Sequence, residues 1–420
     1  MGENTSLSND RSAQAMRPLF WPVIAASWVG LFFHFGSLLV NTFGIFLTTL
    51  TREFGWSRTE VTLAFTLAMI TAMIGMPLAG WISDHVGSRR LIILTMISFG
   101  VMLTAMSLLS GALWQLLIIF LIIGLVGPGT SAIPHANLIS RWRSKRHGLA
   151  LGIAMSGTAC GGVIWPVFAQ SILDRFGYRI SYLLLGGSIL LLAVPIILLL
   201  LREAPDPSQP DDPSASAPMA GMSRREALTT TQFWILTIAF LVFMSSVQAC
   251  LLHLVPLLTD QGMEASKAAG IASLLGLAGI AGRIITGYLL DLINPTIVPV
   301  IAFLIVALGM LMLATGTTGL PAVIAALLIG FGYGADAASI PCLVARFFGM
   351  RSFGEIYSYI FIAVPLGGAI GPALMSAGFD QMGDYRSVRI GSSLLTILAA
   401  GMMLRLTFPG SAPDRLREEP

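Results

Sequence analysis

Arg283 lies in an apolar and small-residue run, LGLAGIAGRIITGYLLDLI, and is the only charged residue between Lys267 and Asp291. A buried guanidinium is costly unless it is paired, and its planar fork suits a carboxylate held by two parallel hydrogen bonds. An internal ion pair with Asp336 is the alternative, but desolvation tends to consume the Coulomb gain of such a pair. The run therefore predicts a fixed positive charge that binds a carboxylate.

Asp336 is the second charged residue deep in an apolar stretch, and it shares the segment GFGYGADAASIP with Tyr333. A buried carboxylate can neutralise itself by taking up a proton. We therefore expect Asp336 to couple a process to protons and Tyr333 to line a binding site.

Three histidines complete the set of candidate binding residues. His34 belongs to a small and polar stripe with spacings of 3, 4, 3 and 4: Ser27, Gly30, His34, Ser37 and Asn41. His34 and Asn41 could line a cavity or bond a neighbouring helix, and His135 follows the bend-prone segment GLVGPGTSAIP. His253 titrates near neutral pH unless burial shifts it, so it is a candidate for ligand binding and for proton coupling. A purely structural role remains the alternative for each histidine.

No sequence pattern indicates catalysis or a bound cofactor. The metalloprotease pattern HExxH, the serine-hydrolase pattern GxSxG and the phosphate-binding pattern GxxxxGK[ST] do not occur in the sequence. Cys160, Cys250 and Cys342 fall in apolar stretches and are interpreted as packing residues rather than as metal ligands. The sequence thus predicts no enzyme, no cofactor and no metal site.

The elements that must position these residues are predicted to cross a membrane. Of the 420 residues, 55% are hydrophobic and only 11% are charged, with a mean hydropathy of +0.82, whereas soluble domains carry about 25% charged residues. The net charge of +3 gives no reason to expect a nucleic-acid partner. The chain is predicted to be an integral membrane protein in contact with the lipid bilayer.

Runs of about 20 apolar residues, the length that spans a bilayer, predict an all-α membrane protein. Twelve such runs lie at 20–50, 57–83, 90–110, 112–140, 147–173, 178–201, 230–259, 266–292, 295–316, 319–346, 353–379 and 386–408.

The chain divides into two similar halves. Adding 207 to Gly75, Gly80 and Asp84 gives Gly282, Gly287 and Asp291, and further glycines and prolines repeat at offsets of 206 or 207. Such parallel repeats are typical of transporters with two six-helix bundles. The predicted parts are an N-terminal tail (1–19), a first six-helix bundle (20–201), a linker (202–229), a second six-helix bundle (230–408) and a C-terminal tail (409–420).

The distribution of basic residues predicts the orientation in the membrane. With the N-terminus inside, 16 of the 24 Lys and Arg residues fall on the cytoplasmic side and 7 on the other, with Arg283 between them. Because cytoplasmic loops carry the excess of Lys and Arg, both termini are predicted to be cytoplasmic.

The loop GWISDHVGSRR, at 80–90, resembles the signature loop of the major facilitator superfamily. The resemblance implies two pseudo-symmetric six-helix bundles. It also implies a gating or conformational role for five residues of this loop: Gly80, Asp84, Gly87, Arg89 and Arg90.

A narrower resemblance is carried by RWRSKRHGLALGIAMSG, which looks like the fifth-helix signature of the monocarboxylate porter family, although Arg143 stands where an aromatic residue is usual. Two further segments, ARFFGMRSFGEIYSYIF and GAIGPALMSAGFDQMGDYR, resemble bacterial members. The resemblance implies that Arg283 anchors the substrate carboxylate and that His253 lies near the anion. Those porters place an Asp where this chain has Gly279, so Asp336 could have taken over proton coupling, or transport could be exchange without a proton.

Together these features predict a secondary transporter, working by alternating access, that moves a lactate- or pyruvate-like monocarboxylate with a proton. An exchanger of anions such as oxalate and formate is one alternative, and a membrane sensor of carboxylates that does not transport is another. We expect a monomer in the bacterial inner membrane.

Overall fold

The computed structural model describes residues 20–142, 146–204, 221–316, 319–382 and 386–406. Within these ranges the chain is mostly helical, and eleven helical stretches are long and apolar enough to cross a membrane. One of them, His147–Leu200, turns at Gly177, whose φ of 73° is left-handed, and so holds two of the twelve predicted spans. The predicted all-α membrane fold is confirmed.

The N-terminal half begins with helical residues 20–32 and a π-helical turn at Gly36–Val40. The helices that follow are α2 (Phe43–Phe54), α3 (Arg58–His85), α4 (Ser88–Ala105), α5 (Leu113–Val126), α6 (Ala132–Ser140), α7 (His147–Ser188) and α8 (Val194–Leu200).

The C-terminal half begins with a short helix, α9 (Arg224–Leu228), that precedes the spans. The helices that follow are α10 (Thr231–Asp260), α11 (Ala265–Leu292), α12 (Ile297–Ala314), α13 (Leu320–Gly334), α14 (Asp336–Phe348), α15 (Phe353–Phe361), α16 (Ala363–Met382) and α17 (Arg386–Leu404).

The described residues cluster into two compact units. The first unit takes them from Met1–Gly75, His85–Ser144 and Ile153–Ala215, and the second from Met76–Asp84, Lys145–Gly152 and Ser216–Pro420. The second unit therefore includes two short segments that the sequence division places in the first bundle. The predicted tails, most of the predicted linker and Arg143 lie outside the described residues, and the predicted domain boundaries stay a prediction.

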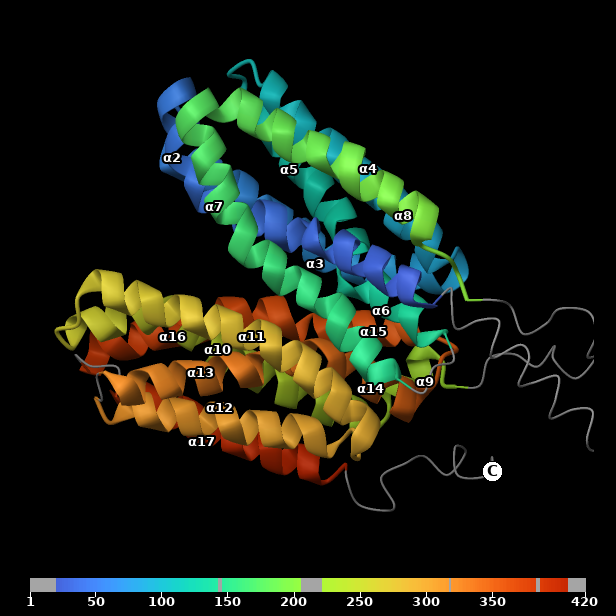
Figure 1. Cartoon of the computed structure of the whole chain (residues 1–420), viewed down its shortest axis with the longest axis vertical. Helices are drawn as coiled ribbons and strands as arrows, with labels where there is room; N and C mark the ends of the chain where they lie inside the picture. The colour runs from blue at the N-terminus through green and yellow to red at the C-terminus, as the bar shows by residue number, and fades with distance from the viewer. Residues whose placement is uncertain (1–19, 143–145, 205–220, 317–318, 383–385, 407–420) are drawn as a thin grey trace, which may run out of the picture. The chain divides into compact units, whose positions relative to one another are not determined.

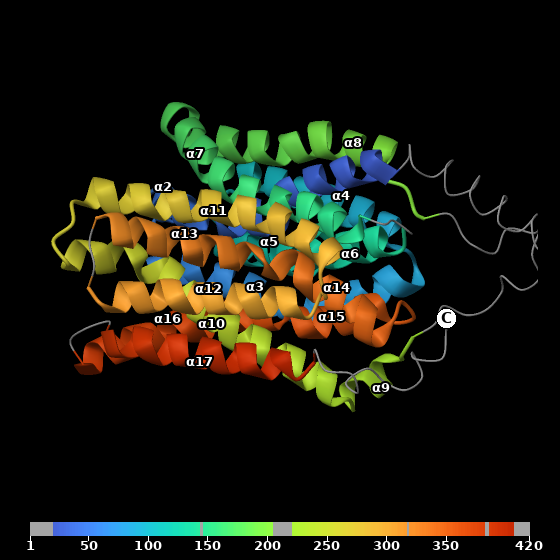
Figure 2. The same ribbon diagram turned by 60° about the horizontal axis from the view of Figure 1, so that its bottom comes forward.

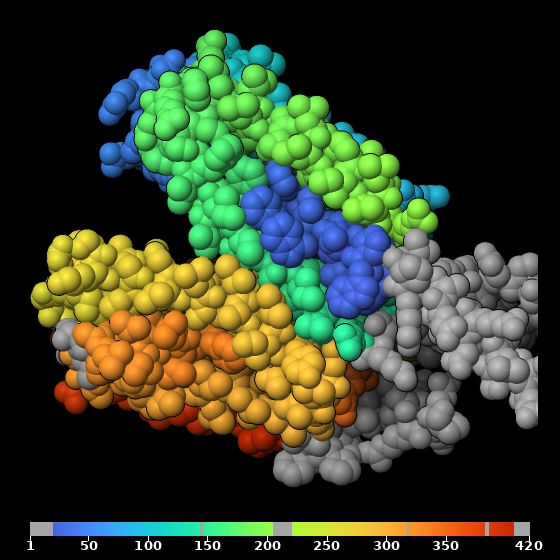
Figure 3. All heavy atoms as spheres, viewed as in Figure 1, coloured from blue at the N-terminus to red at the C-terminus, as the bar shows by residue number. Residues whose placement is uncertain are grey.

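Helices of the second unit pack side by side along their length. α10 lies against α16, α11 against α13, and α12 against both α13 and α17 (Figures 1 and 2). Large apolar side chains are exposed on these helices, such as Leu304 and Leu308 on α12 and Ile324 on α13, and Figure 3 shows atoms of this part of the chain at the surface. An apolar exterior of this kind suits contact with lipid, which cannot solvate polar groups.

Two spans are interrupted where their sequences are rich in glycine. The fourth span changes from α5 to α6 through a 3-10 turn at Gly127–Thr130, and Ser131 caps α6 by accepting a hydrogen bond from the backbone of Ile133. The tenth span breaks at Ala335, between α13 and α14. Glycine is a poor helix former, so both breaks fall where helical propensity is lowest.

Candidate functional site

Arg283 is held on α11 by glycine-mediated packing against α13. Gly282 faces the backbone of Phe331, and a Cβ added at Gly334 would meet the backbone nitrogen of Arg283 at 2.7 Å. Only glycine lets two helix backbones approach this closely. The glycines of GLAGIAGR and GFGYG therefore place Arg283 beside the end of α13.

The break in the tenth span places Asp336 at the first position of α14. A helix N-terminus carries partial positive charge from its unpaired amide groups, which favours a carboxylate there. Asp336 is 6% exposed. A carboxylate is therefore buried where the backbone itself offsets part of its desolvation.

Arg283, Tyr333 and Asp336 come together, as the sequence predicts for a shared site. The Arg283 guanidinium lies 5.7 Å from the centroid of the Tyr333 ring, and Arg283 and Asp336 lie within electrostatic range of each other. Arg283 is 7% exposed. The group offers a cation, an aromatic face and an acid, which can bind a carboxylate and hold a proton.

His34 and His135 come together in the first unit. A Cβ at Gly30 would meet the His135 ring at 2.7 Å, and the two histidines interact electrostatically. His135 is fully buried, and neither of its ring nitrogens has a hydrogen-bond partner among the described residues. The His34 Nδ1 lies 2.6 Å from the carbonyl oxygen of Leu31 and 3.0 Å from the hydroxyl of Ser37.

Asn41 caps the π-helical turn that interrupts the first span. Its backbone N–H donates to the carbonyl of Gly36, and its side chain is exposed. The helical stripe predicted from Ser27 to Asn41 therefore loses its regular spacing after residue 32, because that spacing assumes an uninterrupted α-helix.

His253 is held by a neighbouring helix. Its Nε2 lies 3.4 Å from the carbonyl oxygen of Pro372 and 3.3 Å from the hydroxyl of Ser376, both on α16. A role for His253 in binding or coupling stays a prediction.

Asp84, predicted to act in gating, caps α15 within the second unit. Its two carboxylate oxygens accept hydrogen bonds from the backbone N–H groups of Gly354, at 3.0 Å, and Glu355, at 2.9 Å. Gly80 lies against the backbone of Gly354, where an added Cβ would approach the carbonyl carbon at 2.7 Å. The signature loop thus joins α3 to the start of α15.

Asp291, the repeat counterpart of Asp84, makes the same contact at the start of α7. It accepts hydrogen bonds from the backbone of Gly148, at 2.6 Å, and Leu149, at 2.9 Å. The sequence repeat at offset 207 is therefore also a repeat of interactions.

The remaining gating candidates lie in the first unit. Gly87 has a φ of 104°, a conformation that favours glycine. Arg89 donates from its backbone to the Glu203 carboxylate and from its Nε to the carbonyl of Leu201, both at 2.7 Å. Arg90 is exposed. Their gating role stays a prediction.

One buried cation, Arg389, is not among the site residues predicted from the sequence. Arg389 is buried in α17 and donates to the carbonyl of Leu313 on α12. The signal was present, because Arg389, Ser393 and Thr396 follow at spacings of 4 and 3 and all three are buried.

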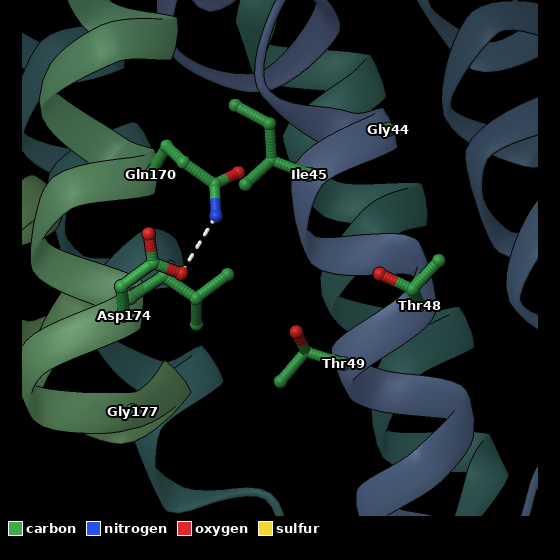
Figure 4. A pocket seen from close by; sticks show the side chains of 8 residues that line it. Gly44, Ile45, Thr48, Thr49, Gln170, Asp174 and Gly177 are labelled. Carbon is green, nitrogen blue, oxygen red and sulfur yellow. Dashed lines mark hydrogen bonds between the residues drawn. The ribbon is translucent and has the colours of Figure 1, made fainter.

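A cavity of about 520 Å³ opens between α2 and α7 in the first unit. Figure 4 shows Thr48 and Thr49 on one wall, with Gln170 and Asp174 on the other. The Gln170 amide donates to the Asp174 carboxylate at 2.8 Å. The lining of the cavity includes the acidic residue Asp174 and no basic residue, so the cavity does not suit an anion.

A family model described as Major Facilitator Superfamily matches residues 27–372. The chain belongs to the major facilitator superfamily. As a member of this superfamily it is a multi-pass membrane protein and a transporter, and such transporters bind small-molecule substrates within the membrane.

Relatives of this superfamily member cover nearly its whole length. MFS-type transporter 1 of an Ophiocordyceps species is 27% identical over 90% of this chain and 83% of the relative. Mouse monocarboxylate transporter 11 is 26% identical over 94% of this chain and 88% of the relative. The solved proton:xylose symporter XylE shares the fold with a TM-score of 0.73 at 15% identity, covering 93% of this chain and 96% of the symporter.

Proposed function

We propose that this superfamily member is a proton-coupled transporter of small monocarboxylates in which Arg283 binds the substrate carboxylate. The observation that carries the proposal is a buried guanidinium held by glycine packing beside the α13–α14 break, next to Tyr333 and Asp336. Similarity to monocarboxylate transporter 11 supports the substrate class.

The cost of burying Arg283 argues for a ligand-binding role. A charge at membrane depth costs several kcal/mol, roughly 2.5 to 3.5 on insertion scales. An ion pair with a purely structural role would not compensate for that cost, because apolar side chains of similar volume often give the protein equal stability. Binding of a substrate carboxylate with two hydrogen bonds would explain why an arginine is buried at this position.

Charge balance supports a proton as the coupled ion. Arg283 and a charged Asp336 together sum to zero, and a bound monoanion makes the site negative. Uptake of one proton by Asp336 restores neutrality, and a neutral buried site is far cheaper than a charged one. Asp336 also supplies, from α14, the acid that the related porters carry at the position of Gly279. A dianion would need a second positive charge.

We propose alternating access, with the chain acting as a monomer in the bacterial inner membrane and with both termini cytoplasmic. The excess of basic residues in the predicted cytoplasmic loops supports the orientation.

The test is uptake of labelled lactate and pyruvate into proteoliposomes under an imposed pH gradient, with oxalate and succinate as competitors. We expect Arg283→Lys to retain little transport, because lysine keeps the charge but loses the fork, and Arg283→Ala to retain none. Arg175→Ala, which alters an exposed arginine, is the control. Normal uptake by a well-expressed Arg283→Ala would refute the proposal.

The same assay separates the alternatives. Counterflow without gradient-driven accumulation indicates an exchanger, and saturable binding without either indicates a sensor. Stronger competition by oxalate or succinate than by lactate indicates a dianion site.

A further inference from the structure

Three buried oxygen atoms on α14 and α15 have no hydrogen-bond partner among the described residues. They are Asp336 Oδ1, Ser339 Oγ and the hydroxyl of Tyr357. Ser339 and Tyr357 are both 0% exposed. Buried polar atoms are paired with protein or ordered water in the great majority of cases, so three in one region require an explanation.

The three groups belong to one region of the fold. Asp336 and Ser339 are three residues apart on α14 and so share a helix face. Tyr357 lies on α15, which packs against α14, and it interacts electrostatically with Asp336.

Ser358, the neighbour of Tyr357, shows that buried hydroxyls here are otherwise paired. It is also 0% exposed, but its hydroxyl donates to the carbonyl of Glu355 at 2.6 Å. A buried hydroxyl on the same helix can therefore find a backbone partner, whereas the hydroxyl of Tyr357 has none among the described residues.

Water fits these three groups better than a metal cation does. A buried water makes about three hydrogen bonds to polar groups that otherwise lack partners, and two hydroxyls and a carboxylate oxygen supply that number. The charged and titratable groups facing Asp336 are Arg283 on α11, Tyr333 on α13 and Tyr357. The positive charge of Arg283 opposes a second cation.

We propose that Ser339 and Tyr357 bind ordered water against Asp336, and that the coupled proton reaches and leaves the Asp336 carboxylate through this water. In the charged state the water donates a hydrogen bond to Oδ1. When a proton arrives from the aqueous side, the water gives one of its own protons to Oδ1 and takes up the arriving proton in the same step, so that it stays neutral and then accepts from the new O–H group. Ser339 and Tyr357 orient the water and do not change protonation. The proton-transfer step rests on the proposed function; the water site does not.

The first experiment measures thermal unfolding in detergent and does not depend on transport. A water-bound hydroxyl contributes a hydrogen bond, so Tyr357→Phe and Ser339→Ala should each lower the melting temperature. Their effects should be less than additive, because both hold the same water. If the pocket is dry, each substitution removes an unsatisfied polar group and leaves the melting temperature unchanged or raises it, which would overturn the proposal.

The second experiment compares gradient-driven accumulation with exchange in proteoliposomes. Losing one hydrogen bond of ordinary strength to the water should slow accumulation about tenfold in Tyr357→Phe and Ser339→Ala, while exchange stays near that of the unmodified protein. Ser358→Ala removes a buried hydroxyl that is already paired and should change neither.

The outcomes separate the two proposals. A lowered melting temperature with equal loss of both transport modes keeps the water site and refutes its role in proton transfer. Absence of proton-driven accumulation in the unmodified protein refutes the proposed function and leaves the unfolding result as the test of the water site. Accumulation driven by a Na⁺ gradient would indicate that a metal cation, and not a water and a proton, binds beside Asp336. This result would overturn the proposal.

Discussion

Replacing Asp336 with Asn should separate its role in proton coupling from its role as a counter-charge for Arg283. Asparagine keeps the shape of the side chain but cannot be ionised. Asp336 is 6% exposed and Arg283 is 7% exposed, so neither charge is compensated well by solvent. Removing one partner of a buried pair typically destabilises a protein by about 3 to 5 kcal/mol. The cation–π contact with the ring of Tyr333, whose centroid lies 5.7 Å from the guanidinium, is already present in the unmodified protein and does not offset this loss. We therefore expect a loss of about 3 to 5 kcal/mol.

A bound substrate should reverse a large part of that loss, because its carboxylate replaces the missing negative charge. A ligand at 100 times its dissociation constant stabilises the folded state by about 2.7 kcal/mol. Thermal unfolding of Asp336→Asn should thus shift further on addition of lactate or pyruvate than that of the unmodified protein. The variant should exchange substrate but show no accumulation driven by a pH gradient.

The assay uses one purified preparation for unfolding with and without the acid, for exchange and for gradient-driven uptake. Asp174→Asn, at an exposed position, serves as the control. Unchanged proton-driven accumulation would exclude Asp336 as the coupling group and make His253 the next residue to test. Equal loss of both transport modes, with no extra stabilisation by the acid, would leave Asp336 only a structural role.

Three other substitutions test the packing, the caps and the orientation. Gly334→Ala should destabilise the protein by about 1 to 3 kcal/mol through overpacking and reduce uptake, whereas Gly391→Ala, where a Cβ meets nothing within 4 Å, should be tolerated; equal melting temperatures would contradict this. Asp84→Asn and Asp291→Asn should each lower stability by about 1 kcal/mol, because each weakens a charged helix cap, and a change in only one of them would show that the two caps are not equivalent. Thr48→Cys, in a background without the native cysteines, should react with an impermeant maleimide added outside intact cells; labelling only after lysis would reverse the predicted topology.

The sequence predicts the spans well, because the length of an apolar run is set by the thickness of the bilayer. It also identifies Arg283 and Asp336 as candidates, because a charge stands out in an apolar run, and the structure places both beside Tyr333. The interruptions at residues 33–42 and at Ala335 could not be predicted in detail, since a helix break depends on which backbone groups find other partners. Tyr357 could not be predicted as a site residue either, because a tyrosine in an apolar helix is an ordinary packing residue until its hydroxyl is known to lack a partner.

The glycine contact between α11 and α13 also has a mechanical consequence. At Gly282 and Gly334 backbone lies directly against backbone, so no side-chain rotation is available to absorb a small displacement of one helix along the other. A displacement of α11 at Arg283 should therefore move α13 with it. The tenth span is interrupted at Ala335, so we expect a displacement of α13 to change its angle to α14 there, and the residue immediately beyond this interruption is Asp336.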